Sequence, residues 1–233
     1  QRQQIYYHPG IAMILLAHLH RATGAQRFLD ACRELLAFAE RTDLNDQAKA
    51  ALLASIDKMQ SDAERRNVLL AISNRIDLLN EETVNAFLRS TQQMNSNAER
   101  RNVLLAFIKT YPANQSLPVA FDEALQSFSS DAERRNVLLA TLAERPNSDG
   151  PGLDRLLEAV EDMQSSSEKR NVLIKLVDRY PQRRELPDTF YRTTGGINSI
   201  SEFIEVYAMV INRTSLSRQT VSAILASTAN TRR

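Results

Sequence analysis

One eleven-residue sequence motif, which we call the word, recurs along this chain at a nearly constant interval. It reads SDAERRNVLLA at 61–71, SNAERRNVLLA at 96–106, SDAERRNVLLA at 130–140 and SSSEKRNVLIK at 165–175, and a diverged copy, SISEFIEVYAMV, starts at Ser199. The glutamate of the word falls at Glu64, Glu99, Glu133, Glu168 and Glu202, in steps of 35, 34, 35 and 34 residues. A period of this size is typical of helical hairpins stacked along a solenoid. The repeat therefore predicts an all-α fold.

The same period divides the 233 residues into repeats. The most diverged copy covers 24–60, and the others cover 61–95, 96–129, 130–164, 165–198 and 199–233, behind an N-terminal helix within 1–23. We expect a single right-handed α-solenoid domain over 1–233, built from about six helical hairpins of 34–35 residues.

Each copy of the word carries the chemistry that starts a helix. In a Ser-x-x-Glu capping box, the hydroxyl accepts from the third helical amide and the carboxylate reaches back to the amide of the cap residue. The pattern therefore predicts that the word opens the first helix of each repeat. It fits five pairs: Ser61 and Glu64, Ser96 and Glu99, Ser130 and Glu133, Ser165 and Glu168, and Ser199 and Glu202.

Prolines predict where the first helix of a repeat ends and the second begins. A proline cannot continue a helix, but it suits the first helical turn. We expect Pro112, Pro146 and Pro181 to end first helices, and Pro118, Pro151 and Pro187 to open second helices. The second helices are predicted to begin near Asn80, Leu117, Leu153, Leu186 and Ser215.

The two basic residues of the word point in different directions on a helix that turns about 100° per residue. Arg66 falls between Leu69 and Leu70, on an arc that is apolar in the other copies. A buried guanidinium needs acceptors, and an asparagine beside it can bridge neighbouring copies. We therefore predict a polar ladder that joins repeats, rather than a working site copied four times. Its members are Arg66, Asn67, Arg101, Asn102, Arg135, Asn136, Arg170 and Asn171.

The residue before each ladder arginine falls toward the edge of that arc, where a long side chain can keep its charge in water. Stacked repeats would align these four residues as a basic ridge, formed by Arg65, Arg100, Arg134 and Lys169. The ridge is either a solvated face balanced by nearby carboxylates or a docking strip for an acidic or phosphorylated partner.

Composition and charge limit the classes of function that this chain could have. A net charge of +1 gives no overall field that would attract nucleic acid. The longest apolar run, Ile11 to Ala17, is too short to span a membrane. No glycine-rich phosphate loop, serine nucleophile elbow or Cys/His ligand spacing occurs, so we expect no cofactor and no metal. The single cysteine, Cys32, slightly favours a reducing, cytoplasmic compartment, although a periplasmic one stays open.

The N-terminal segment holds the other candidates for chemistry. His18 and His20 are two residues apart on a predicted helix and point to different sides, which is poor geometry for a shared metal. Tyr6, Tyr7 and His8 form a short aromatic entry that could pack on the first helix or border a cleft. Because the chain opens on Gln rather than Met, we expect a processed or excised piece.

The word SDAERRNVLLA resembles helical repeats of about 35 residues in bacterial proteins, including regions of some BlaR-type membrane metallopeptidases. That resemblance covers about 61–210 and implies an interaction role, not peptidase activity, because the chain has no His-Glu-x-x-His. Residues 10–41 are similar to a helix pair of the (α/α) toroid enzymes. HEAT and tetratricopeptide arrays have similar periods, but the tetratricopeptide Trp and Gly-Tyr positions are absent.

These observations together predict a non-catalytic scaffold that binds a protein or peptide, with an acidic partner favoured by the basic ridge. No nucleic-acid partner and no membrane insertion are expected. The alternative is a part of an (α/α) toroid or metallopeptidase-like enzyme, with a cleft near Tyr6, Tyr7, His8 and His18.

Overall fold

The computed structural model describes residues 53, 54, 56, 57, 59, 61–74, 80–145, 151–179, 186–213 and 221–226. Within these residues it contains helices and no strand, which confirms the all-α prediction. The chain forms two compact units, Gln1–Pro112 and Ala113–Arg233. The division falls in the loop that joins the two helices of the repeat over 96–129. The predicted N-terminal helix and most of the repeat over 24–60 lie outside the described residues.

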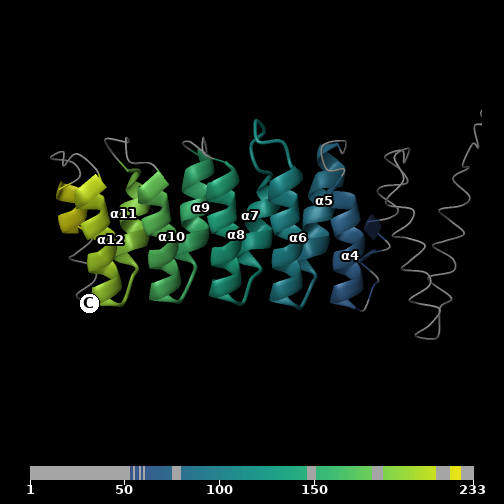
Figure 1. Ribbon diagram of the computed structural model, residues 1–233, viewed down its shortest axis with the longest axis horizontal. Coiled ribbons are helices and arrows are strands. Elements are labelled where there is room, and N and C mark those ends of the chain that lie inside the picture. Colours follow the sequence, from purple (N-terminus) through teal and green to yellow (C-terminus); the bar gives the residue numbers. More distant parts are fainter. Residues whose placement is uncertain are drawn as a thin grey trace, which may run out of the picture. The chain divides into compact units, whose positions relative to one another are not determined.

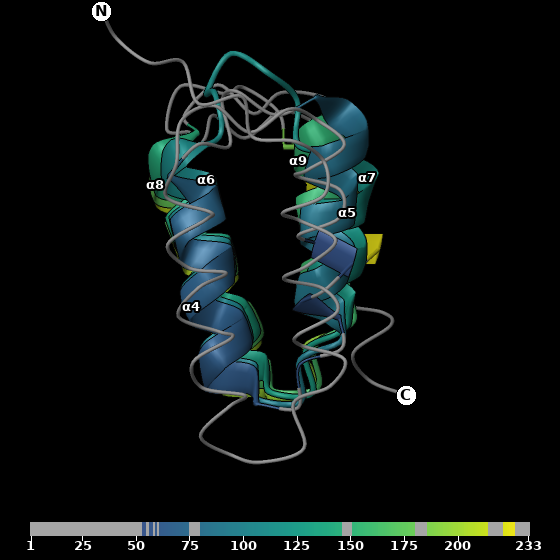
Figure 2. The same ribbon diagram turned by 90° about the vertical axis from the view of Figure 1, so that its right-hand side faces the viewer.

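The first unit contains α4 (Asp62–Ser73), α5 (Glu81–Gln92) and α6 (Asn97–Thr110), and residues 53, 54 and 56 are also helical. The first helices of two successive repeats, α4 and α6, pack side by side (Figure 1). The second helix α5 also contacts α6. Viewed along the row, α4 and α6 form one layer and α5 belongs to the other (Figure 2).

The second unit repeats this arrangement with α7 (Val119–Gln126), α8 (Asp131–Glu144), α9 (Pro151–Glu161), α10 (Ser166–Arg179), α11 (Asp188–Gly195) and α12 (Ile200–Arg213), and 221–226 are also helical. The first helices α8, α10 and α12 pack in one row, and the second helices α7, α9 and α11 pack in another. Because α10 also contacts α9 and α11, the two rows form two layers.

Helix starts follow the predicted serine chemistry. The Oγ of Ser61, Ser96 and Ser130 accepts from the amide three residues later at 3.3–3.4 Å. Ser165 and Ser199 make the same contact at 3.4 and 3.5 Å. Each contact satisfies an amide that has no partner inside the helix. The serine contact of each predicted capping box is therefore confirmed.

The described prolines also behave as expected. Tyr111-Pro112 directly follows α6, Pro151 is the first residue of α9, and Pro118 and Pro187 immediately precede α7 and α11. α11 ends at Gly195, before Gly196. Pro146 and Pro181 lie outside the described residues.

Aliphatic and aromatic side chains fill the space between the layers. In the first unit the rings of Phe87 and Phe107 stack with their centroids 5.9 Å apart, and both side chains are fully buried. In the second unit Phe121 and Phe190 are equally buried. Burial of such aromatic side chains stabilises each unit by roughly 2–3 kcal/mol per ring.

Candidate functional site

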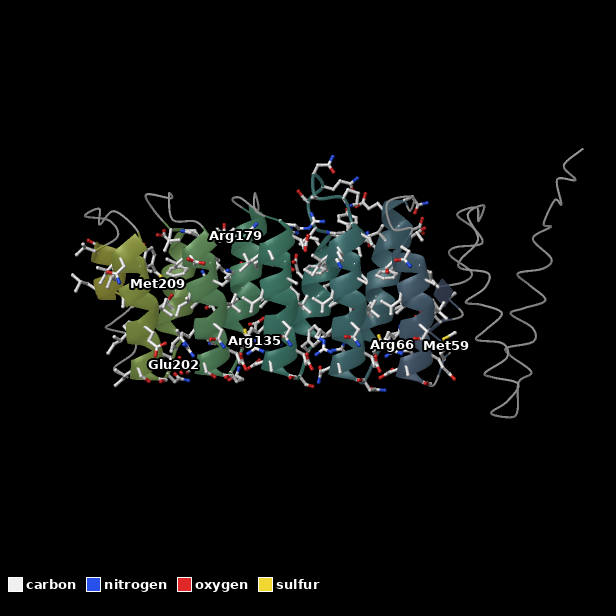
Figure 3. All side chains as sticks on the ribbon, in the orientation of Figure 1. Met59, Arg66, Arg135, Arg179, Glu202 and Met209 are labelled. Carbon is white, nitrogen blue, oxygen red and sulfur yellow. The ribbon has the colours of Figure 1, made fainter. Side chains whose placement is uncertain are left out.

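The polar residues of the recurring word meet near the start of each first helix, where one repeat adjoins the next. The second arginine joins successive first helices. Arg66 Nη1 donates to Glu99 Oε2 at 2.6 Å, and Arg135 Nη1 donates to Glu168 Oε2 at 2.5 Å. Figure 3 shows Arg66 and Arg135, each near the first turns of its own helix.

Arg170 makes the corresponding contact to α12. Its Nε pairs with the carboxylate of Glu202, and its Nη1 donates to Glu205 Oε2 at 2.7 Å. These arginine side chains keep 26–28% of their surface exposed, so the prediction that they are buried within the apolar arc is wrong. Exposed pairs of this kind contribute about 0.2–1 kcal/mol each.

The asparagine of the word acts within its own helix rather than between repeats. Asn67, Asn102 and Asn136 each accept through Oδ1 from the arginine immediately before them, at 2.9–3.0 Å. The Nδ2 of Asn102, Asn136 and Asn171 donates to the glutamate three residues earlier, at 3.2–3.4 Å. The expectation that the asparagine bridges neighbouring copies is therefore wrong. The asparagine binds the arginine and the glutamate of its own copy, and it is these two side chains that contact the neighbouring copies.

Arg101 has this asparagine contact as well, because its Nε and Nη2 donate to Asn102 Oδ1 at 3.3 and 3.0 Å. The fixed fork of a guanidinium suits such a two-pronged contact. All eight predicted ladder residues thus take part in hydrogen bonds with other residues of the word.

The acidic residue after the capping serine makes a contact that the sequence reasoning missed. Asp62 Oδ2 accepts from the amide of Ser96 at 2.6 Å, and Asp131 Oδ2 accepts from the amide of Ser165 at 2.7 Å. The hydroxyl of Ser166 accepts from Ser199 in the same way, at 3.3 Å. At the start of α6, α10 and α12 the cap amide is therefore bound by the preceding repeat, where the capping box predicted the glutamate.

The predicted basic ridge does not exist as an exposed surface. Arg65, Arg100, Arg134 and Lys169 are only 5–7% exposed. Each arginine donates to the carbonyl six residues before it: Arg65 to Met59 O at 2.7 Å, Arg134 to Phe128 O at 2.8 Å, and Arg100 to Met94 O. The assignment of these four residues to an exposed partner-binding strip is therefore wrong.

The physical reason for this burial is the turn that precedes each word. That turn brings the last carbonyls of the preceding second helix, where the regular helical hydrogen bonding ends, next to the new first helix. The helix dipole adds negative potential there, which favours a cation. Arg100 also donates to Thr91 O and Gln92 O, both at 3.1 Å, and Arg134 to Ala159 O of the next second helix at 3.4 Å.

Lys169 differs from the three arginines because its donors sit on a single ammonium nitrogen and not on a planar guanidinium fork. Its Nζ donates to Gly196 O, at the end of α11, at 3.2 Å. Burial lowers the pKa of the Lys169 ammonium, and the carboxylates of Glu161, Asp131 and Asp162 oppose that effect. Burial likewise lowers the pKa of Arg100, opposed by Asp62.

Within the described residues of the second unit, a shallow groove is lined by side chains of α8, α10 and α12. Leu139, Ile174 and Met209 supply half-exposed apolar surface there. The remaining lining residues are Arg135, Asn136, Asn171, Lys175 and Asp178. Lys175 and Asp178 pair at 3.5 Å while both remain exposed. Met209 is labelled on α12 in Figure 3.

Sequence reasoning missed this groove although a signal was present. The position held by Leu139 and Ile174 is also aliphatic in the other two copies, as Leu70 and Leu105, and all four side chains are half-exposed. An aliphatic residue that recurs beside a core it does not join marks apolar surface.

In the first unit a second groove lies between α5 and the residues Leu53, Ala54 and Asp57. Leu53, Ala54 and Ala86 line it with several polar side chains, and Ser90 Oγ donates to Asp57 Oδ1 at 2.6 Å within it. The residues of the predicted enzyme alternative, Tyr6, Tyr7, His8 and His18, lie outside the described part of the chain, as do His20 and Cys32.

The described residues contain neither a metal-binding cluster nor a membrane-spanning helix. No group of three or more His, Cys, Asp or Glu side chains is placed to hold a metal ion. No described helix is both long and apolar enough to cross a bilayer.

Comparisons with known proteins add no assignment. No family model matches the chain, and neither the curated proteins nor the solved structures contain a significant match to it.

Proposed function

We propose that this chain is a non-catalytic helical-repeat scaffold, in which stacked hairpins form a solenoid and present a groove to a peptide segment of a partner protein. The observation that carries the proposal is the engagement of the recurring polar residues with one another. Serine caps its helix, aspartate binds the next cap amide, and arginine binds the next glutamate. The polar groups of the word bind other groups of the protein itself. This favours a role in holding the repeats together over a role in catalysis on a substrate.

The groove over α8, α10 and α12 is the surface we assign to the partner. Half-exposed Leu139, Ile174 and Met209 give it an apolar floor. The nearby guanidinium of Arg135 already pairs with Glu168, and Lys175 pairs with Asp178. Because these charges are balanced, we propose a short amphipathic peptide that docks mainly through apolar side chains, in place of the acidic partner that the basic ridge suggested.

The test is a selection of peptides from a random display library on the wild-type chain, followed by affinity measurements on two variants. Ile174→Lys places a charge on the groove floor and should weaken binding of the selected peptides at least about tenfold, a loss of about 1.4 kcal/mol. Val119→Lys is the matched control, because Val119 is 64% exposed on α7 and does not line the groove.

Binding should also change little with added salt, since apolar contacts are not screened. Peptides that bind both variants equally, or whose affinity collapses in salt, would contradict the proposed groove. A selection that yields no binder would contradict it as well. Thermal melting of each variant establishes that it is folded.

A further inference from the structure

The first helix α12 presents an apolar side where the first helices α8 and α10 present the polar contacts described above. We define the forward face of a first helix by the three positions through which it meets the first helix of the following repeat. In α8 these are Asp131 and Arg135, which bind Ser165 and Glu168, and Leu142, which is 1% exposed. The forward face of α8 thus makes two polar contacts to the following repeat and buries one aliphatic side chain.

The corresponding positions of α10 follow the same rule. Ser166 accepts from the amide of Ser199, Arg170 pairs with Glu202, and Val177 is fully buried. α12 carries isoleucine at all three positions, as Ile200, Ile204 and Ile211. Their exposed fractions are 69%, 58% and 50%.

These isoleucines are spaced for contact with another helix. Ile200, Ile204 and Ile211 follow the i, i+4, i+11 spacing, and the intervening i+7 position is Tyr207, which is 5% exposed. That pattern is the apolar seam along which two helices pack. A row of large, exposed apolar side chains indicates a surface that is covered in solution.

The chemistry of this face excludes a copy that docks in the manner of a following repeat. The first helix of a following repeat brings a glutamate and a cap amide to the junction, as Glu202 and Ser199 do for α10. Against α12 the glutamate would meet Ile204 and the amide would meet Ile200, so both would be desolvated without a partner. A second forward face of the same kind has neither group.

We propose that the forward face of α12 packs against the forward face of α12 in a second copy of this chain, giving a symmetric dimer. The interface continues the row formed by α8, α10 and α12, in which α8 and α10 are each packed against the next first helix through these three positions. An interface that uses the same patch on both copies closes at two. The proposal is independent of the peptide groove, because the groove is lined by other residues.

The first measurement is the mass of the wild-type chain by sedimentation equilibrium over a wide range of protein concentration. We expect association toward twice the chain mass of 26.3 kDa. Ile204→Arg, which restores the residue type of the other forward faces, should weaken association at least about tenfold. Ile200→Asp, the residue of α8 at that position, is a second variant with the same expected result. Val119→Arg should associate like the wild type, because Val119 is as exposed but lies on α7.

The second measurement tests the symmetry. In a Cys32→Ala background, Ile204→Cys should form a disulfide-linked dimer on mild oxidation, because equivalent residues meet near a twofold axis. Val119→Cys should not. A wild-type chain that stays monomeric overturns the proposal, as does a dimer that survives both forward-face variants. A monomer whose melting temperature falls on Ile204→Arg would show that the chain itself covers this face, and would also overturn it.

Discussion

Arg134 and Arg135 are consecutive residues of α8, yet their guanidinium groups find different acceptors. Arg134 is 5% exposed and donates to carbonyls at the ends of second helices, whereas Arg135 is half-exposed and pairs with the carboxylate of Glu168. Removal of a buried donor leaves desolvated carbonyls without a partner, which costs more than breaking an exposed ion pair. Adjacent residues of one motif therefore contribute different amounts to the free energy of unfolding.

Asp122 is a half-buried acid outside the recurring word, and the direction of its pKa shift predicts that the stability of the second unit depends on pH. Its carboxylate lies 3.2 Å from Arg155 Nη1. Burial raises the pKa of Asp122 to about 6, against the lowering effect of Arg155, and Glu158 and Glu123 add to the rise. Because the folded pKa lies above the unfolded value of 3.8, this group stabilises the fold fully below about pH 4 and loses that contribution as the pH rises through about 6.

We predict that Asp122→Asn removes this dependence. The melting temperature of the wild type should fall relative to that of the variant between about pH 4 and about pH 7, as followed by circular dichroism. Arg155 keeps one acceptor in the variant, since its Nη2 donates to Leu117 O at 3.1 Å. If the wild type instead gains stability relative to the variant over this range, the ion pair with Arg155 outweighs burial and the direction of the pKa shift is wrong.

At the scale of the element, each first helix starts with help from the repeat before it. Asp131, at the start of α8, accepts from the amides of Gln164 and Ser165, which precede α10, both at 2.7 Å. Loss of a capping acceptor costs about 0.5–2 kcal/mol. Asp131→Ala should therefore lower the free energy of unfolding by about 1–2 kcal/mol in urea titrations.

Asp131→Ser is the matched control, because Ser166 binds the start of α12 through a hydroxyl at the same position. Asp131→Ser should lose less stability than Asp131→Ala, since both variants lose the charge and only the alanine loses the acceptor. Equal losses would show that the charge, and not the hydrogen bond, stabilises the junction.

The caps and the helix order could be predicted from the sequence because they depend on local chemistry. The serine hydroxyl binds an amide three residues away, and the prolines lie directly at helix ends. Neither feature requires knowledge of what packs on the helix.

The side of the helix that faces the core could not be fixed in this way. The first helix of a repeat is apolar over five consecutive positions, Val68 to Ile72, so its periodicity fits more than one orientation. The buried residues are Arg65, Val68, Leu69, Ile72 and Ser73. Arg65 lies one turn before Leu69 on this face, which is why the basic ridge was misplaced. The carbonyl groups that bind Arg65 lie in the turn before the helix. A helical projection of the first helix alone therefore cannot show them.

At the scale of the whole molecule, each unit is held by contacts of one kind repeated along it. The first unit contains the Arg66–Glu99 pair and the buried Arg65 and Arg100. The second unit contains the same contacts at Arg134 and Arg135. Because the net stability of a domain is about 5–15 kcal/mol, several such contacts decide whether it folds.

The central claim is that the recurring word holds repeats together and is not a site for a partner. It is tested most directly by replacing the buried basic residues as a set. The variant Arg65→Met with Arg100→Met and Arg134→Met leaves carbonyls without donors in both units, at a cost of about 1–3 kcal/mol per site. The matched set, Arg66→Met with Arg135→Met and Arg170→Met, breaks only half-exposed ion pairs.

The measurement is thermal unfolding of both sets by circular dichroism. The buried set should lose cooperative unfolding or melt far below the wild type, while the half-exposed set should remain folded and melt only slightly lower. A buried set that unfolds cooperatively at the wild-type melting temperature would contradict the account, because these arginines would then be free to serve a partner.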